Sequence, residues 1–264
     1  MNYFKKIVWI TGASSGIGEA IATMLAPEKP VLILSSRNEK ELQRVQKICT
    51  EAGAESHIFP LDLSSPDSIN QVTEKVLEQF KRVDLLINSG GISQRSTVLE
   101  TPVEVDRKIM EINFFGTIGL TKAVLPAMVK QGGGQIAAVS SVVGKFGFPL
   151  RSSYSASKHA LHGFFETVEA ELKKDKIRTS VVIPGRVKTK ISINAITRDG
   201  TAYGVMDEGQ AKGISAEKCA KVIINGLKKN KKEILVGGRE TLMVHIRRFL
   251  PSLYFKIASK LKAT

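Results

Sequence analysis

Short apolar runs alternate with amphipathic segments of helical length along most of this 264-residue chain, and this alternation constrains the fold more than any other feature. Most of the runs are rich in Val, Ile and Leu, and they lie at 7–10, 31–34, 56–59, 83–87, 135–139, 179–183 and 233–236. Strands that are apolar at nearly every position and separated by helices form parallel sheets covered on both faces. Right-handed crossovers then favour an α/β fold with a doubly wound sheet of seven parallel strands.

The length fits a single α/β domain, which we place at 1–240, followed by a C-terminal helical extension at 241–264. One long irregular stretch, 186–213, is rich in Gly, Ser, Thr and Asn. A loop of that length in a compact domain is usually a lid or a binding loop. We find no run of about eighteen apolar residues and therefore expect no segment that spans a membrane.

Cysteine and histidine usage argues against a metal centre. Cys49 and Cys219 lie far apart and outside any CxxC pattern, and the four histidines are scattered without metal-ligand spacing. Buried thiols of this kind are typical of a reducing compartment, so we expect a cytoplasmic protein.

A glycine-rich motif follows the first apolar run: residues 11–18 read Thr-Gly-Ala-Ser-Ser-Gly-Ile-Gly and lead into a helical pattern. Glycine is needed where the backbone turns tightly and approaches a pyrophosphate closely, and the free N–H groups of the following helix favour the same anion. With a strand before it and a helix after it, the motif predicts a Rossmann-type dinucleotide site and the strand order 3-2-1-4-5-6-7. The residues expected to contact the cofactor here are Gly12, Ser14, Ser15, Gly16, Ile17 and Gly18.

The end of the second apolar run indicates which dinucleotide is bound. A protein that binds NAD usually offers a carboxylate to the ribose 2′-hydroxyl at this point, but residues 35–37 read Ser-Ser-Arg and include no acid. The guanidinium of Arg37, beside Ser36, can instead pair with a 2′-phosphate. The sequence therefore predicts NADP(H), although an exposed arginine at a helix start would look the same.

Tyr154 and Lys158 place a phenol and an ammonium four residues apart, on one face of a predicted helix. Such a pair is common by accident. Here it follows Ser140 and Ser141 at the end of the fifth apolar run, and open α/β sheets keep their ligands at the carboxyl ends of their strands. The position therefore favours an active site.

Taken together, these motifs resemble the short-chain dehydrogenase/reductase family over residues 5–240. The matching positions are the motif at 11–18, Asp62, Asn88, Asn113, Ser141, Tyr154, Lys158, and Pro184-Gly185 with Thr189. One departure stands out. The family usually shows Asn-Asn-Ala-Gly after the fourth strand, whereas this chain has Asn88-Ser89-Gly90-Gly91, which puts the cofactor contacts of that turn in doubt.

The resemblance implies a role for each of these residues. Tyr154 would exchange a proton with the substrate oxygen, and a free phenol with a pKa of about 10 would need Lys158 and the nicotinamide charge to favour its phenolate. Ser141 would hydrogen-bond the substrate oxygen, and Asn113 would hold a water that links Lys158 to solvent. Lys158 would also grip the nicotinamide ribose, Asp62 would meet the adenine and Thr189 the carboxamide. The remaining cofactor contacts expected by resemblance are Leu63, Asn88, Ser89, Gly90, Pro184, Gly185 and Val187.

The function that follows is an NADP(H)-dependent alcohol dehydrogenase or carbonyl reductase. Its partner would be a small-molecule carbonyl or alcohol, and we expect this substrate to be apolar or lipid-like. We also expect a homodimer or homotetramer. Two alternatives remain open. A 3-oxoacyl-carrier-protein reductase would explain a basic surface, but similar enzymes end soon after the seventh strand. A non-catalytic NADP-binding regulator would not need the intact set Asn113, Ser141, Tyr154 and Lys158.

The net charge of +14 lies entirely in the second half, since residues 1–132 carry 15 basic and 15 acidic side chains and residues 133–264 carry 24 and 10. A solvated surface and an anionic partner both fit this excess. We find no nucleic-acid-binding motif and expect no such partner.

The extension 241–264 contains five of the basic residues and no acid. An apolar stripe recurs there at helical spacing: Leu242, Ile246, Phe249, Leu250, Leu253, Ile257 and Leu261. The basic residues fall largely outside the stripe, and Pro251 predicts either a kink or two shorter helices. The stripe could pack on its own domain or on a second subunit. It could also rest on anionic lipid, with Phe249, Tyr254 and Phe255 below the headgroups.

Overall fold

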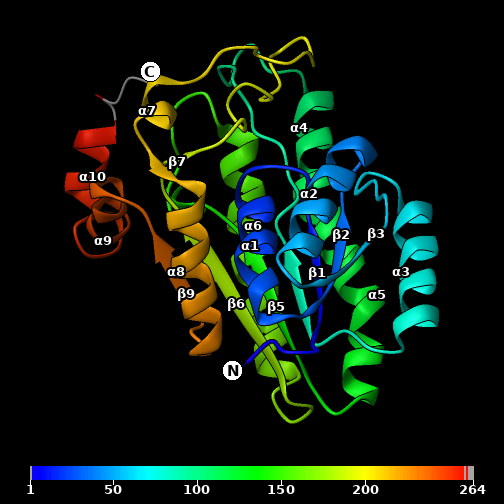
Figure 1. Ribbon diagram of the computed structural model, residues 1–264. Coiled ribbons are helices and arrows are strands. Elements are labelled where there is room, and N and C mark those ends of the chain that lie inside the picture. The colour runs from blue at the N-terminus through cyan, green and yellow to red at the C-terminus, as the bar shows by residue number, and fades with distance from the viewer. Residues whose placement is uncertain (1, 259, 261–264) are drawn as a thin grey trace.

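The computed structural model describes residues 2–258 and 260, and it confirms a doubly wound parallel sheet in a single domain (Figure 1). The seven strands run in the order β3-β2-β1-β4-β5-β6-β9, and every neighbouring pair is parallel. This is the predicted order 3-2-1-4-5-6-7. The strands are β1 (Ile7–Thr11), β2 (Val31–Ser35), β3 (Glu55–Ile58), β4 (Leu85–Asn88), β5 (Gly134–Val139), β6 (Ile177–Pro184) and β9 (Glu233–Val236).

The apolar runs form strands because both faces of the sheet are covered. All five residues of β1 are buried, and their side chains alternate between two cores. Val8 and Ile10 point into one core, whereas Ile7 and Trp9 point into the other. A period of two with both faces apolar is the expected signature of a central parallel strand.

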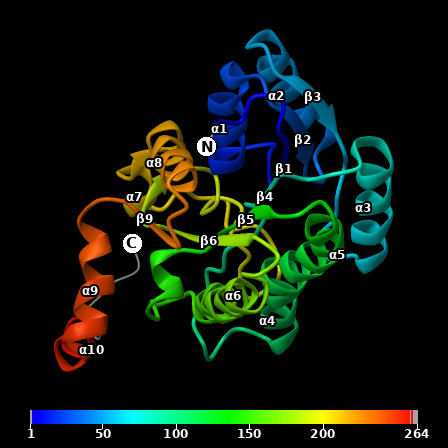
Figure 2. The same ribbon diagram turned by 90° about the horizontal axis from the view of Figure 1, so that it is seen from below.

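Helices cover the two faces of the sheet (Figure 2). One face carries α1 (Gly16–Leu25), α2 (Glu39–Glu51) and α8 (Ala216–Lys228). The other carries α3 (Pro66–Phe80), α5 (Gly116–Lys130) and α6 (Ser152–Glu171). Three of these helices begin where a polar side chain accepts a hydrogen bond from the first turn, because Asn38, Ser65 and Ser215 occupy the N-cap positions of α2, α3 and α8.

One continuous helix runs from 103 to 130 through α4 (Val103–Met110), a single π-helical segment (Glu111–Phe115) and α5. An 18-residue window in it has a mean hydropathy of 1.4, so by length and composition it could cross a membrane. The expectation that no segment spans a membrane stays a prediction. Leu120, Val124 and Met128 are fully buried in the second core, and we interpret the segment as a core helix of this layer.

The stretch 186–213 is mostly irregular, as predicted, and it is fastened at both ends. Short strands β7 (Val187–Lys188) and β8 (Ile214–Ser215) pair in parallel where the stretch begins and where it ends. Inside it lies the single-turn helix α7 (Glu208–Ala211), and Ile196 forms an isolated bridge to Gln94. Three short 3₁₀ turns occur elsewhere, at Ala26–Glu28, Val142–Gly144 and Arg239–Thr241.

The C-terminal extension forms two short helices, α9 (Leu242–Phe249) and α10 (Pro251–Ala258), of which Pro251 begins the second. The predicted single apolar stripe is corrected in part. Ile246 and Ile257 are half-buried, and Ile246 packs against the second core. Tyr254, expected below lipid headgroups, is buried within the protein. Leu261, from the predicted stripe, and Lys262, from its basic flank, lie outside the described residues.

Candidate active site

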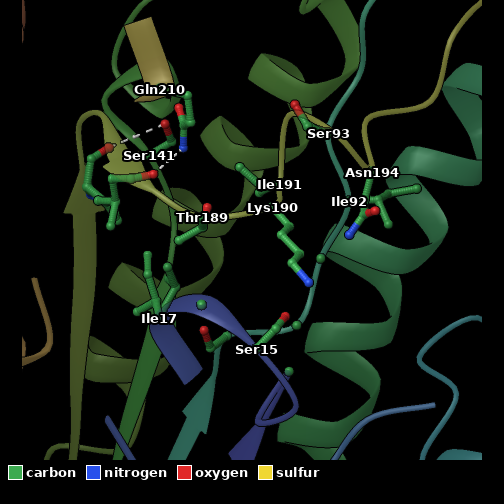
Figure 3. Close-up of a pocket in the computed structure, with 18 of the residues that line it drawn as sticks. Ser15, Ile17, Ile92, Ser93, Ser141, Thr189, Lys190, Ile191, Asn194 and Gln210 are labelled. Carbon is green, nitrogen blue, oxygen red and sulfur yellow. Dashed lines mark hydrogen bonds between the residues drawn. The ribbon is translucent and has the colours of Figure 1, made fainter. Parts of the chain in front are cut away.

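A cavity of about 1530 Å³ opens at the carboxyl ends of the central strands. It is lined by the last residues of β1, β2, β5 and β6, namely Thr11, Ser35, Val139 and Pro184. In Figure 3, Ser15 and Ile17 lie on the side of α1, and Ile191 and Asn194, from the stretch 186–213, lie across the cavity from them. Most of the predicted site residues line this cavity: Gly12, Ser14, Ser15, Gly16, Ile17, Ser36, Arg37, Asp62, Leu63, Ser89, Gly90, Ser141, Tyr154, Lys158, Pro184, Gly185, Val187 and Thr189.

The glycine-rich turn needs glycine for steric reasons. Gly12 and Gly16 have φ of +65° and +60°, a backbone conformation that side chains disfavour. A Cβ on Gly12 would lie 2.9 Å from backbone atoms of Gly90, so the first strand and the fourth approach each other closely here. Gly18 does not line the cavity. It packs against the carbonyl of Gly12, where a Cβ would clash, and so it brings α1 close to β1.

The unusual turn after β4 is held firmly by the first strand. The Thr11 hydroxyl accepts hydrogen bonds from the backbone N–H groups of Ser89 (3.1 Å) and Gly90 (3.0 Å). A Cβ on Gly90 would lie 2.7 Å from the Leu63 side chain, so a glycine at this position lets Leu63 reach the cavity wall. Asn88 does not line the cavity, because its buried amide donates to the Thr121 hydroxyl at 3.1 Å.

At the rim of the cavity, Arg37 and Asp62 follow β2 and β3. Arg37 is exposed and lies close enough to Asp62 to influence its ionisation. Burial opposes ionisation of Asp62, but hydrogen bonds from Ser64 and the charge of Arg37 outweigh it and lower the pKa of the carboxyl. The backbone N–H and hydroxyl of Ser64 both donate to this carboxylate.

Tyr154 and Lys158 lie one turn apart near the start of α6 and both reach the cavity. The Lys158 ammonium donates to the carbonyl of Val139 at 2.8 Å and lies 5.8 Å from the centroid of the Tyr154 ring. Burial lowers the pKa of Lys158 to about 8. Burial also raises the pKa of Tyr154, while the Arg151 cation and a hydrogen bond with Ser141 act in the opposite direction. The phenol, the ammonium and the Ser141 hydroxyl therefore lie close together in one part of the cavity.

Asn113 lies behind this group rather than in the cavity wall. The π-helical segment directs its side chain to the loop after β4, where Nδ2 donates to the Ile92 carbonyl (2.9 Å) and Oδ1 accepts from the Ile92 N–H (2.8 Å). Nδ2 also donates to the Ser157 hydroxyl at 3.1 Å. Asn113 therefore ties this loop to α6, and its role in holding a water stays a prediction.

A buried ion-pair cluster on the far wall was not predicted from the sequence. Asp207, from the stretch 186–213, pairs through one carboxylate oxygen with Arg95 (2.6 Å) and through the other with Arg151. All three residues line the cavity, and their side chains are at most 14% exposed. Arg151 also donates to the Ser93 hydroxyl (2.6 Å) and the Gln94 carbonyl (2.8 Å). No local pattern could reveal this cluster, because its members come from three separate loops.

Lys190 is a second residue that the motifs did not indicate. It lies in the same stretch, and in Figure 3 its ammonium points toward the side of the cavity where Ser15 lies. The remaining walls on the far side include the apolar side chains Phe146, Phe148, Ile196, Met206 and Met243. The cavity is thus polar along the glycine-rich turn and more apolar beyond Tyr154.

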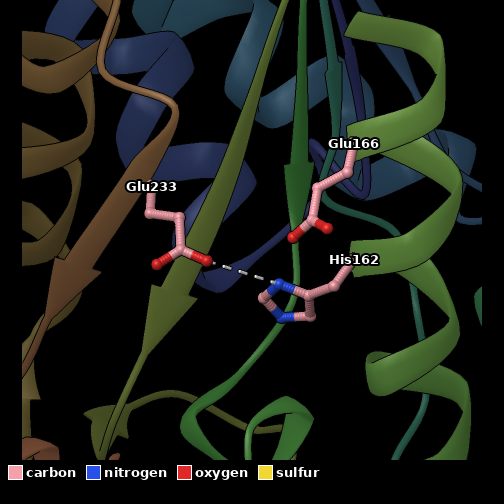
Figure 4. Close-up of side chains that lie close together, drawn as sticks. All are labelled: His162, Glu166 and Glu233. Carbon is pink, nitrogen blue, oxygen red and sulfur yellow. Dashed lines mark ion pairs between the residues drawn. The ribbon is translucent and has the colours of Figure 1, made fainter. Parts of the chain in front are cut away.

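A separate group of potential metal ligands lies on the outer part of α6 and β9 (Figure 4). One ring nitrogen of His162 and carboxylate oxygens of Glu166 and Glu233 lie within 4.8 Å of one another. His162 bonds through Nε2 to the Ser140 hydroxyl at 3.0 Å, and its Nδ1 lies 3.9 Å from Glu233. The ammonium of Lys145 pairs with the same Glu233 oxygen, so a cation already balances this carboxylate. The absence of a metal centre stays a prediction.

Comparisons with known proteins agree with this geometry. A family model described as short chain dehydrogenase matches residues 6–199. The chain is 42% identical over 260 residues to the dehydrogenase/reductase SDR family protein 7-like of Drosophila melanogaster, which covers 97% of this chain and 80% of that protein. It is 40% identical over 256 residues to the dehydrogenase/reductase SDR family member 7B of Mus musculus, covering 95% of this chain and 79% of that protein.

Two solved structures are similar over most of their length. An alcohol dehydrogenase from the archaeon Thermococcus sibiricus, complexed with 5-hydroxy-NADP, superposes with a TM-score of 0.77 at 28% identity, covering 89% of this chain and 97% of that one. A short chain dehydrogenase/reductase from Burkholderia phymatum, in complex with NAD, superposes with a TM-score of 0.81 over 100% of this chain and 98% of that one. At 23% identity, the second likeness supports the fold alone.

Proposed function

Because the chain belongs to the short-chain dehydrogenase/reductase family and is thus an NAD(P)-dependent oxidoreductase, we propose that it is an NADP(H)-dependent carbonyl reductase or alcohol dehydrogenase. The observation that carries the proposal is the meeting of Ser141, Tyr154 and Lys158 in the cavity that also holds the glycine-rich turn. An acid–base group at hydrogen-bonding reach of a bound carbonyl is what this reaction requires.

The residues of the cavity fit a dinucleotide. No side chain fits between Gly12 and Gly90, so backbone atoms form the cavity wall there, and Ser15, at the N-cap of α1, makes no side-chain hydrogen bond to the first turn. The N–H groups of that turn therefore favour a pyrophosphate. The Lys190 ammonium, directed to the same side, adds a charge that suits it. When bound, the nicotinamide supplies or accepts the hydride.

The preference for NADP(H) rests on Arg37. Its exposed guanidinium lies at the rim of the cavity, after a strand that ends without a carboxylate at 35–37. A guanidinium that binds a phosphate through two parallel hydrogen bonds is among the stronger recognition contacts in proteins. Ser36 and Asp62, which also line the rim, would flank the adenosine.

Within the cavity, Tyr154 would hold and donate the proton at its phenolic oxygen during reduction, and would accept it in the reverse direction. Ser141, whose hydroxyl acts to lower the pKa of this phenol, would orient the substrate oxygen. Lys158 is fixed by the Val139 carbonyl and, with a pKa of about 8, carries its positive charge in most molecules near pH 7. That charge would stabilise the phenolate after the proton has left.

The substrate region favours an apolar carbonyl compound. Beyond Tyr154, the side chains of Phe146, Phe148, Ile196, Met206 and Met243 line the cavity together with the ion-pair cluster around Asp207. Small-molecule sites are mostly apolar with a few polar groups that fix orientation, and here these would be Ser141 and Tyr154.

The proposal is tested by NADPH oxidation with a panel of apolar ketones, aldehydes and 3-oxoacyl thioesters. Removal of the phenolic proton in Tyr154→Phe should lower turnover by about 10²–10⁴ while NADPH still binds. The matched control is Tyr3→Phe, which removes a hydroxyl from the core and should leave turnover within about twofold. Activity with 3-oxoacyl thioesters alone would favour a carrier-protein reductase, and NADPH binding without turnover on any carbonyl would favour a regulator.

A further inference from the structure

The helix pair α9–α10 exposes more large apolar surface than its length requires. Five side chains within 14 residues are between 44% and 70% exposed: Leu242, Phe249, Leu250, Leu253 and Phe255. Single exposed apolar residues are normal, but several on one element mark a surface that binds something. In both views, the pair stands at the edge of the molecule, away from the sheet (Figures 1 and 2).

The charges on the same helices have one sign. Arg247, Arg248 and Lys256 lie among the exposed apolar residues, and residues 241–258 contain no acid. The two guanidinium groups lie against aromatic rings: Arg248 is 5.8 Å from the Phe249 centroid, and Arg247 is 5.3 Å from that of Phe255. Cations and large apolar side chains are therefore interleaved on this surface. Helices that rest at the headgroup level of a bilayer have this composition.

The helix pair is attached firmly to the domain. The Tyr254 hydroxyl donates to the Gly147 carbonyl at 2.6 Å, and its ring packs on Phe146 with centroids 5.7 Å apart. Met243, on the inner side of α9, lines the cavity together with Phe146. The exposed residues are consequently held at a fixed position beside the mouth of the active site.

We propose that α9–α10 is a docking surface for an anionic lipid bilayer, with Phe249, Leu250, Leu253 and Phe255 entering the headgroup layer and Arg248 and Lys256 meeting lipid phosphates. A bilayer suits the surface better than a second copy of the chain does. In a two-fold interface the same patch meets itself, so arginines would face arginines, and residues 241–264 contain no acid to compensate them. Anionic lipid complements both the charge and the apolar side chains.

The proposed lipid binding does not depend on the reaction in the cavity, although it is consistent with an apolar substrate. A bilayer bound at α9–α10 would lie next to a cavity wall that contains Met243 and Phe146. A substrate that partitions into the bilayer would then have a short path to the cavity. The binding itself can be measured without any substrate.

The test is co-sedimentation of the whole protein with vesicles of phosphatidylglycerol and phosphatidylcholine, compared with vesicles of phosphatidylcholine alone. We expect binding to the anionic vesicles that weakens as salt is raised, because surface charges are screened. Replacing two apolar side chains, in Phe249→Ser/Phe255→Ser, should weaken binding at least tenfold, and Arg248→Glu should weaken it about tenfold at low salt.

Two matched variants change the same chemistry elsewhere on the surface. Val98→Ser/Leu99→Ser removes two exposed apolar side chains from another loop, and Lys174→Glu reverses an exposed charge on the turn before β6. Both should bind vesicles like the wild type, and thermal unfolding should confirm that all four variants fold. Equal weakening by the controls, or no sedimentation of the wild type at low salt, overturns the proposal. So does a stable oligomer that dissociates in Phe249→Ser/Phe255→Ser without any vesicle binding, since that outcome assigns the surface to a second copy.

Discussion

Two opposite walls of the cavity keep their shape by different means. The glycine-rich wall comes from the segments 11–17, 35–37, 61–63 and 89–91, and its geometry depends on backbone atoms in close contact, as between Gly12 and Gly90. The catalytic wall consists of residues 139–158 and 186–213, and side chains join its parts. Its main connections are the pairs of Asp207 with Arg95 and Arg151, and the bond of His162 to Ser140 behind it.

The difference shows which perturbations each wall should resist. Backbone contacts at van der Waals distance are insensitive to pH and salt but intolerant of one added carbon atom. Buried ion pairs and hydrogen bonds tolerate small changes of volume but depend on the ionisation of each partner.

Asp207→Asn should loosen the stretch 186–213 within the catalytic wall. It removes a carboxylate that pairs with two nearly buried guanidinium groups, and breaking a buried pair costs about 3–5 kcal/mol. Local opening should then become at least about a hundredfold more frequent. Limited trypsin digestion measures this opening, through the rate of cleavage after Lys190, Arg198 or Lys212.

Asp199→Asn is the control, because Asp199 lies in the same stretch but is exposed and makes only a long ion pair, 3.8 Å from Arg198 Nε. Its cleavage rate should stay near that of the wild type, since exposed pairs contribute little. Equal digestion of wild type and Asp207→Asn would mean that backbone contacts hold this wall as well.

The catalytic wall should also be sensitive to acid through His162. Burial, assisted by the nearby Lys145, lowers the pKa of His162 to about 4, from an ordinary value of about 6.5 in the unfolded chain. The folded state therefore binds this proton less readily, so the stabilisation is complete above about pH 6.5 and is lost as the pH falls toward 4. The loss should reach about 3 kcal/mol.

Urea unfolding at pH 7 and pH 4 measures this loss. In His162→Gln the decrease in the free energy of unfolding between the two pH values should be about 3 kcal/mol smaller than in the wild type. The exposed His245 provides the control, because His245→Gln should show the wild-type decrease. An unchanged decrease in His162→Gln would contradict the assignment of the acid sensitivity to this residue.

At the rim of the glycine-rich wall, Arg37→Ala should weaken NADPH binding by about 1.5–3 kcal/mol, or roughly 10–100-fold, because it removes a charge-assisted phosphate contact. NADH binding should change by less than about twofold, since NADH carries no 2′-phosphate. Fluorescence titration with both cofactors measures the ratio. Arg178→Ala, at the opposite end of the sheet, should change neither affinity. Equal affinity of the wild type for NADPH and NADH would refute the preference.

The steric character of the glycine-rich wall is tested by one methyl group placed at two glycines. In Gly18→Ala the new Cβ would meet the Gly12 carbonyl, and we expect a loss of about 1–3 kcal/mol in unfolding free energy together with weaker NADPH binding. In Gly163→Ala, within α6, no heavy atom lies within 4 Å of the new Cβ. This variant should gain up to about 1 kcal/mol from helix propensity. Equal thermal midpoints for the two variants would remove the steric argument.

The sequence was sufficient to predict the sheet and most of the glycine-rich wall, for a physical reason. The signals there are local: apolar runs of strand length, a turn that needs Gly12 and Gly16, and a serine-arginine pair at a strand end. The doubt about the turn at 88–91 came from its departure from the family's usual Asn-Asn-Ala-Gly. The structure supplies what that pattern could not, because the hydroxyl of Thr11, remote in sequence, holds Ser89 and Gly90 in place.

On the catalytic wall, a recognisable spacing indicated Ser141, Tyr154 and Lys158, and the family resemblance added Val187 and Thr189. The Asp207 cluster depends on three loops that meet only after folding, so no pattern along the chain could indicate it. Asn113, Asn88 and Gly18 were expected to contact the cofactor or the proton path, but all three are packed behind the cavity wall. Motif spacing identifies residues that belong to a site without showing which of them face the ligand.

The strand order also has a consequence for how the chain is made. Because β1 lies in the middle of the sheet, strands are added outward from it as synthesis proceeds from the N-terminus, at about 5–20 residues per second. The nascent chain therefore possesses all of the glycine-rich wall once residue 91 has left the ribosome, well before Tyr154 is translated. Until β9 emerges, β6 remains an open edge whose backbone groups can pair with a foreign strand. The nucleotide-binding half precedes the chemical half in time, and the last strand protects what the earlier strands leave exposed.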